Sequence, residues 1–292
     1  MATLARTQNA SQVSGVAPMR ERFNRAAKYI LLTMFTLTWL LPLFATLLTS
    51  FRTMDDITLN GFWSIPREFV YQNFIEAWTA ARVRQYLLNS FIITIPSLLG
   101  MLFLSSLSAY ALARFKFKGN LLIYFMYVAG TMLPFQILLL PVFRLTNRLG
   151  LYDTYGALIL IHIAFQLGFC TFVMRNFMRT VPGEILDAAR VDGCGEFRIY
   201  GQIMLPLSLP SLAALATLEF TWVFNDFLWA LILLQSDSLR PVTAGLATLQ
   251  GQYVTDWPLI TAGALLATLP TVFVFIFLQR YFIQGLTLGS GK

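Results

Sequence analysis

Long apolar runs alternate with short polar segments along most of the chain. Each run is continuously apolar, without a polar residue at every second position, so it predicts a helix and excludes a membrane-spanning β-strand. A helix needs about 20 apolar residues to cross the hydrocarbon core of a bilayer. Six runs are long enough, and we predict one spanning helix in each: 29–51, 86–113, 120–143, 154–175, 207–235 and 258–280.

The composition favours a membrane protein over a soluble one. Of the 292 residues, 57% are hydrophobic and 12% are charged, whereas a soluble domain carries about 25% charged residues. The net charge of +7 comes from short Lys and Arg clusters between apolar runs and not from one soluble face, so we expect no nucleic-acid partner. The two cysteines, Cys170 and Cys194, lack the spacing of a disulfide framework or a metal motif, and we expect no metal site.

The distribution of Lys and Arg predicts the orientation. With a cytoplasmic N-terminus, the inner segments hold 14 of these residues and the outer segments hold 7, as the positive-inside rule requires. We therefore expect an all-α polytopic membrane protein with six transmembrane helices and both termini in the cytoplasm. Its parts would be an N-terminal tail (1–28), a transmembrane domain (29–283) and a C-terminal tail (284–292) whose glycines leave it too flexible to form a helix alone.

One polar stretch, 182–206, lies between two spans and would face the cytoplasm. Its sequence predicts two short helices joined at Gly193, a position where a helix stop favours a residue that tolerates positive φ. Glu184 and Asp187 would place negative charge near the positive end of the first helix, and the second helix would cover 196–205. These residues alone favour an amphipathic linker that rests on the membrane surface.

The spacing within this stretch resembles the "EAA" loop of bacterial ABC importer permeases, which reads E-A-A, three residues, G, nine residues, I-x-L-P. The match departs at its first position, where an aspartate replaces the glutamate. We call 182–206 the EAA-like loop. The resemblance implies a helix that docks into a cytoplasmic ATPase, and the residues expected to couple the two are Glu184, Asp187, Ala188, Ala189, Asp192, Gly193, Ile203, Leu205 and Pro206.

Segments 224–234 and 245–287 are similar to the carbohydrate-uptake branch of that family, close to the smaller, six-span subunit of the maltose-type pair. The resemblance implies a sugar or oligosaccharide importer in the bacterial inner membrane. Its partners would be a second permease subunit in a heterodimer, two cytoplasmic ATPase subunits, an extracytoplasmic sugar-binding protein and the lipid bilayer.

The chain has no G-x-x-x-x-G-K-[ST] segment. We therefore expect no enzyme activity and no cofactor in it, with ATP and Mg²⁺ bound by the partner ATPase.

Two acidic residues interrupt the apolar run of the fifth predicted span. A charge near the bilayer centre costs at least about 2.5 kcal/mol, so such a residue usually faces a cavity or a partner. Helical spacing would place Glu219, Trp222 and Asp226 on one face. With Asn225 and Trp229 they would line a substrate pathway, where tryptophan supplies a stacking surface for sugar. A helix–helix hydrogen bond that fixes packing remains the alternative.

Two outer loops carry further expectations. Within the loop 52–85, residues 69–78 predict a short helix. The loop 236–257 matches the family's outer loop that reaches into the binding protein, and its tip would contain Gln250, Gly251, Gln252 and Tyr253. The alternative that this second loop is only a connector between two spans remains open. The charge of the sugar also stays open, because the outer arginines are balanced by an equal number of acids.

Two other functions compete with the importer. In an ion-coupled secondary transporter, Glu219 or Asp226 would bind a coupling ion, but the inverted repeats typical of such proteins are not evident, and the spacing of the EAA-like loop would have no purpose. A scaffold or assembly protein would not need acids within a span. The lone His162 is more consistent with a packed residue than with a proton relay.

Overall fold

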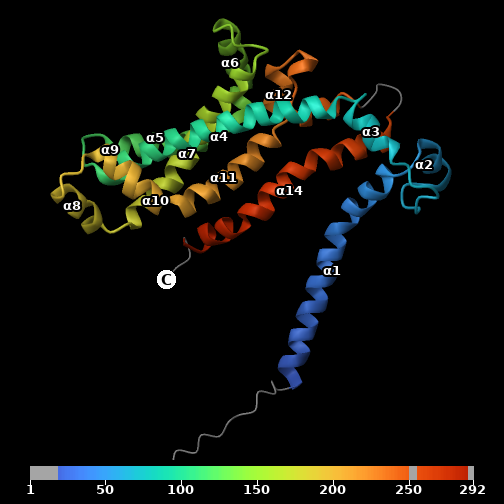
Figure 1. Ribbon diagram of the computed structural model, residues 1–292, viewed down its shortest axis with the longest axis horizontal. Coiled ribbons are helices and arrows are strands. Elements are labelled where there is room, and N and C mark those ends of the chain that lie inside the picture. Colours follow the sequence, from blue (N-terminus) through green and yellow to red (C-terminus); the bar gives the residue numbers. More distant parts are fainter. Residues whose placement is uncertain (1–18, 250–254, 289–292) are drawn as a thin grey trace, which may run out of the picture.

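The computed structural model describes residues 19–249 and 255–288, and the regular elements in these two ranges are helices. The bundle is built mainly of α4 (Val83–Arg114), α7 (Tyr155–Thr180), α11 (Leu209–Phe224) and α14 (Trp257–Leu288). In Figure 1 the helices of the EAA-like loop lie at one end of this bundle and the short helices α2 (Met54–Asn60) and α3 (Gln72–Trp78) at the other. The all-helical prediction is confirmed for the described residues.

Four helices are long and apolar enough to cross a membrane: α4, α7, the part of α1 over Phe23–Ser50 and the part of α14 over Trp257–Gln279. Two bent helix pairs bring the number to six if each pair is one span. The structure thus supports four to six spans.

The third apolar run, predicted as one span over 120–143, is broken at Pro134. It forms α5 (Asn120–Thr131) and α6 (Phe135–Arg148), which meet at an angle of 98°. Pro134 stands directly before α6. Proline lacks an N–H donor and disfavours helical geometry in the residue before it, so the helix stops there.

The fifth run is also broken, and the predicted continuous helix over 207–235 is wrong. α11 ends at Phe224, and α12 (Leu228–Leu233) begins after a gap that contains Asn225 and Asp226. At the other end, Ser208 separates α11 from the short α10 (Leu205–Leu207), and the segment Glu196–Leu207 meets α11 at a bend of 71°. Helix α6 follows the break before Phe135, and α12 follows the break after Phe224. In Figure 1 these two helices project together from one side of the bundle.

The core lies where α4, α7 and α11 meet. Its members share nearly complete burial, and the largest of those less than 2% exposed are Met101, Leu158, Met174, Met178, Leu186, Ile199, Met204, Leu233 and Leu234. A second cluster lies near the end of the bundle that carries α3 and contains Val83, Tyr86, Phe220, Phe224, Val242 and Ala262. Val242 belongs to α13 (Val242–Ala247), which follows a short 3-10 turn (Asp237–Leu239).

Helix α1 (Met19–Ser50) diverges from the rest of the bundle (Figure 1). Every residue from 23 to 44 is exposed, although this stretch is strongly apolar. Only its last turns are buried, and the helix touches α14. So much apolar surface on one helix requires lipid or another protein around it.

The loop that follows α1 is organised by one buried arginine. Arg52 is fully buried and donates hydrogen bonds to the Asp56 carboxylate, to the Gly61 carbonyl at 2.8 Å and to the Ser64 hydroxyl at 2.6 Å. The Arg52 guanidinium holds the pKa of Asp56 below its usual range. Helix α3 confirms the short helix predicted within 69–78, whereas α2 was not predicted.

Helices α1 and α14 both extend into the segments that we predicted to be tails. Helix α1 starts at Met19, inside the predicted tail 1–28. Helix α14 continues to Leu288, so the first five residues of the predicted flexible tail 284–292 are helical, as an extension of the sixth span. Residues 1–18 and 289–292 lie outside the described ranges.

The close packing of α5 on α7 depends on Gly168. A Cβ atom there would lie 2.6 Å from the Tyr127 carbonyl oxygen and 2.9 Å from a Thr131 methyl group. We expect Gly168→Val to destabilise the purified protein by about 1–3 kcal/mol, the usual cost of overpacking, measured as a lower melting temperature in detergent. Gly130→Ala in α5 is the control, because its Cβ would meet nothing within 4 Å. Equal melting temperatures of the two variants would contradict this account of the packing.

Candidate functional site

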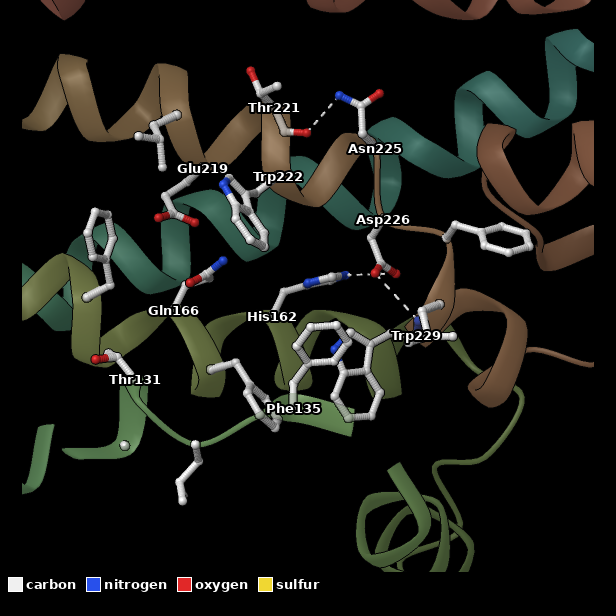
Figure 2. Close-up of a pocket in the computed structure, with 17 residues that line it drawn as sticks. Thr131, Phe135, His162, Gln166, Glu219, Thr221, Trp222, Asn225, Asp226 and Trp229 are labelled. Atoms are coloured by element: carbon white, nitrogen blue, oxygen red, sulfur yellow. Dashed lines mark hydrogen bonds and ion pairs between the residues drawn. The ribbon is translucent and has the colours of Figure 1, made fainter. Parts of the chain in front are cut away.

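A cavity of about 790 Å³ lies where the third and fifth runs are broken. Figure 2 shows side chains from α7, from α11 and from both breaks converging on it. Irregular backbone at membrane depth occurs only where it is buried in protein or lines a water-filled cavity. The polar and tryptophan side chains that line the cavity are Thr131, His162, Gln166, Glu219, Thr221, Trp222, Asn225, Asp226 and Trp229.

Glu219 is the most unusual member of this lining. It is fully buried, and neither carboxylate oxygen has a hydrogen-bond partner of normal geometry among the described residues. The thiol of Cys170 is its neighbour, and a thiol is only a weak donor. In Figure 2 the carboxylate of Glu219 points toward the amide of Gln166 on α7. A buried carboxylate without a partner is costly, so Glu219 offers acceptor atoms for a water or for a ligand that donates hydrogen bonds.

Asp226 has a structural role that we did not predict. It lies in the break after α11, and its carboxylate accepts hydrogen bonds from the backbone N–H groups of Trp229 at 3.5 Å and Ala230 at 3.2 Å, at the start of α12. His162 is buried, and its Nε2 lies 3.8 Å from Asp226 Oδ2. The helical-face argument that grouped Asp226 with Glu219 is wrong, since α11 ends before Asp226, but both residues line the same cavity.

The two tryptophans of the cavity differ in access. Trp229 is buried and its ring lies 5.2 Å from that of Phe165 and 6.3 Å from that of Phe135, so it forms part of a wall. Trp222 is 62% exposed and is free to offer a face to a ligand. The Asn225 side chain donates to the Thr221 carbonyl at 2.9 Å, which satisfies a carbonyl in the last turn of α11.

The EAA-like loop forms the two helices that we predicted. α8 (Gly183–Val191) ends before Gly193, whose φ is +80°, and α9 (Glu196–Ile199) follows. A π-helical turn (Tyr200–Met204) and α10 complete the second half. The prediction of positive φ at Gly193 is confirmed. A Cβ there would meet nothing within 4 Å, so the backbone angle alone restricts this position.

The residues of the motif divide into an inward and an outward set. Ala189 is buried against the chain's own core, whereas Ala188 is exposed. Ile203 and Leu205 pack against the core from the π-helical turn and α10. The members that remain exposed for a partner are Glu184, Asp187, Ala188, Asp192, Gly193 and Pro206.

Arg190 connects the parts of the EAA-like loop. It donates hydrogen bonds to Asp187 at 2.6 Å and to Glu196 at 2.8 Å. The hydrogen bonds to Glu196 and to Asp187 raise the pKa of the Arg190 guanidinium. Asp187 therefore forms an ion pair within the loop. It does not lie in the first turn of α8, whose only acidic residue is Glu184. Our placement of Asp187 at the helix end was wrong.

Two tyrosines and one arginine connect the loop to the bundle. Tyr110 on α4 donates to Glu196 at 2.7 Å, and Tyr200 shares a hydrogen bond of 2.7 Å with Ser106, also on α4. Arg114, at the end of α4, donates to the carbonyls of Met178 and Val181, just before α8. These contacts were not predicted, because each joins residues far apart in sequence.

The predicted contact for a binding protein lies outside the described residues; it consists of Gln250, Gly251, Gln252 and Tyr253. Gln166 was missed, although a single glutamine in an apolar run is a signal for an inward-facing polar residue.

Residues 101–288 match the family model described as "Binding-protein-dependent transport system inner membrane component". The chain belongs to this family. It is 40% identical over 254 residues to the arabinooligosaccharides transport system permease protein AraQ of Halalkalibacterium halodurans, which covers 86% of this chain and 90% of that protein. It is 30% identical over 281 residues to the diacetylchitobiose uptake system permease protein NgcG of Streptomyces coelicolor, covering 96% of this chain and 93% of that protein.

The fold is also found in a solved structure. A chain of a bacterial ABC transporter involved in the import of the acidic polysaccharide alginate superposes with a TM-score of 0.79, covering 91% of this chain and 99% of that chain at 19% identity. At this identity the likeness concerns the fold alone. The permease interpretation is confirmed: the chain is a multi-pass membrane permease subunit of a binding-protein-dependent ABC importer, and none of these likenesses supports an ion-coupled transporter.

Proposed function

We propose that this permease subunit forms half of the translocation pathway of a sugar or oligosaccharide importer in the bacterial inner membrane, with six spans and both termini in the cytoplasm. The observation that carries the proposal is the cavity at the two broken spans, with its buried Glu219, whose carboxylate has only the weak thiol donor of Cys170 beside it. The relatives named for arabinooligosaccharides and diacetylchitobiose support a sugar as the cargo. A second permease subunit, in a heterodimer, would supply the other half and cover the exposed α1.

The lining of the cavity suits a neutral sugar. Sugar hydroxyls donate hydrogen bonds, and Glu219, Gln166 and Asp226 offer oxygen acceptors from three sides. Trp222 offers an aromatic face against which a sugar ring packs. The described lining residues include two carboxylates but no lysine or arginine. Like charges brought together in such a site cost several kcal/mol, so an acidic sugar of the alginate kind would be disfavoured here.

Coupling to ATP hydrolysis would run through the EAA-like loop. Two cytoplasmic ATPase subunits, which bind ATP and Mg²⁺, would receive the exposed side of α8 around Ala188. Arg190 and Tyr110 tie α8 to α4 through Glu196, and α4 packs along α7, which supplies His162 and Gln166 to the cavity. Movement of α8 when the ATPase closes would therefore shift one wall of the cavity. This connection supports transport by alternating access.

On the outer side, an extracytoplasmic sugar-binding protein would deliver the cargo. We propose that the loop 236–257 contacts it through Gln250, Gly251, Gln252 and Tyr253. The resemblance of this loop to that of the carbohydrate-uptake branch supports the assignment.

The coupling proposal is tested by two valine substitutions that lie two residues apart. Gly193 has a φ of +80° and Gly195 a φ of −71°, while neither Cβ would meet an atom within 4 Å. A β-branched residue at positive φ is strained by about 1–3 kcal/mol, which would misalign α8. We expect Gly193→Val to lower sugar-stimulated ATP hydrolysis of the assembled complex by about tenfold or more, and Gly195→Val to leave it nearly unchanged. Equal hydrolysis by both variants would argue against coupling through this loop.

The cavity proposal is tested at Glu219. Removing an acceptor of charge-assisted hydrogen bonds costs about 1.5–3 kcal/mol, so we expect Glu219→Ala to lower uptake of a neutral oligosaccharide about tenfold or more. Glu219→Gln keeps polar atoms and should retain more uptake. Glu76→Ala, on the exposed part of α3, serves as the control. Assembly is followed by co-purification of the ATPase: an assembled Glu219→Ala variant with normal uptake would remove this cavity from the pathway, and loss of assembly would show a packing role instead.

A further inference from the structure

A second hollow, of about 840 Å³ and open to the outside, lies at the end of the bundle that carries the EAA-like loop. It is formed by the end of α4, the loop 115–119, the first turn of α5 and the last third of α7. In Figure 1 the connection from α4 to α5 lies beside α9. We call it the basic hollow, because its charged lining residues are Lys116, Lys118, Arg175 and Arg179, and no acid is among the described residues that line it.

Arg175 shows that the basic hollow is a built site and not a loose group of surface cations. Its side chain is more than nine-tenths buried, its Nε donates to the Leu112 carbonyl at 3.3 Å, and its guanidinium carbon lies 3.9 Å from the centre of the Tyr124 ring. Within the described residues no hydrogen bond or ion pair joins its two terminal nitrogens. A buried cation without a counter-charge is unfavourable, and two parallel N–H groups of a guanidinium fit a phosphate.

The start of α5 adds a second contribution to the same place. Asn120, Leu121 and Leu122 line the basic hollow and form the first turn of this 12-residue helix. The N–H of Asn120 already donates to the Phe117 carbonyl at 3.2 Å and that of Ile123 to the Gly119 carbonyl at 2.9 Å. The N–H groups of Leu121 and Leu122 remain for an anion, which the helix dipole favours there. The Asn120 side chain donates to the carbonyls of Leu112 at 3.2 Å and Phe115 at 2.9 Å, which holds the loop folded over the hollow.

The rim of the basic hollow is apolar. Phe115, Phe117, Leu121 and Leu122 line it and are between 39% and 66% exposed. A free phosphate would make no use of such a rim, whereas a phospholipid would place its acyl chains against it and its phosphate on the cations. Basic pockets between spans on the cytoplasmic side are suited to anionic headgroups.

We propose that the basic hollow binds the phosphate of an anionic phospholipid in the inner leaflet. The proposal uses the cytoplasmic orientation of this end of the bundle, which belongs to the proposed function. A lipid there would hold the α4–α5 loop against α7. Arg114, the residue before this loop, contacts the carbonyls of Met178 and Val181, which precede α8. Basic residues that served only to orient the chain in the membrane would need neither a hollow nor a buried arginine.

The test is lipid binding by the purified full-length chain, measured by native mass spectrometry in detergent with phosphatidylglycerol or phosphatidylcholine of the same acyl chains. We expect phosphatidylglycerol to bind preferentially. Lys116 and Lys118 are exposed, so K116Q/K118Q should fold normally and bind about fivefold more weakly for each lysine removed. R144Q/R148Q removes two exposed cations from the predicted outer side and should bind as the unchanged chain does. R175Q should also lose binding, and its melting temperature reports any loss of the Leu112 and Tyr124 contacts.

Each other outcome overturns the proposal. Equal binding of the two lipids, or unchanged phosphatidylglycerol binding by K116Q/K118Q, would leave the cations with a role in orientation only. Displacement of phosphatidylglycerol by excess inorganic phosphate would show a site for free phosphate instead of a lipid. Because the measurement needs no sugar, no ATPase and no orientation in a membrane, its failure is distinguishable from failure of the proposed transport function.

Discussion

Backbone N–H and C=O groups at membrane depth have no water to bind, and this constraint decides where the bundle can depart from helical geometry. Besides the bend at Ser208, the chain departs from it before Phe135 and after Phe224, and these two breaks face one cavity. At the break after Phe224, polar side chains satisfy the freed groups. Asp226 accepts from the first N–H groups of α12, and Thr243 donates to the carbonyl of Asp226. After these pairings the carboxylate of Glu219 has only the weak thiol donor of Cys170 beside it, and the proposed sugar pathway rests on this unused acceptor capacity.

The same bundle joins the cavity to the EAA-like loop by direct contacts. The loop's own ion pairs fix its shape. Tyr110 on α4 and the loop's Tyr200, which bonds to Ser106 on α4, fasten that shape to the bundle. Helix α8 can therefore act on the bundle as a rigid body, because its inward face, with Leu186 and Ala189, is already packed into the core. Only its outward face is left for an ATPase. The division of the motif into inward and outward residues explains why one short segment can serve both the fold and the partner.

The sequence located the apolar runs and the EAA-like loop because both are local patterns. Hydropathy shows how far an apolar run extends, and a glycine such as Gly193 indicates a helix end because it adopts positive φ without strain. Pro134 gave a local signal for the first break. The second break has no proline within it; it depends on Asp226, which caps α12, and on Thr243, seventeen residues farther along the chain. Tyr110 and Glu196 are 86 residues apart, and no periodicity could connect them.

The central claim is that the cavity belongs to a sugar pathway whose outer access is controlled by the ATPase. Leu218 lines the cavity without taking part in its polar contacts, so Leu218→Cys places a reporter there. Cys170 is fully buried, and only Cys194 needs replacement, by serine. In the reconstituted complex, a membrane-impermeant maleimide added from outside should label Leu218→Cys faster when the ATPase is trapped with ATP, and sugar should slow the labelling. A labelling rate that is the same with and without ATP, and that sugar does not change, would contradict the account.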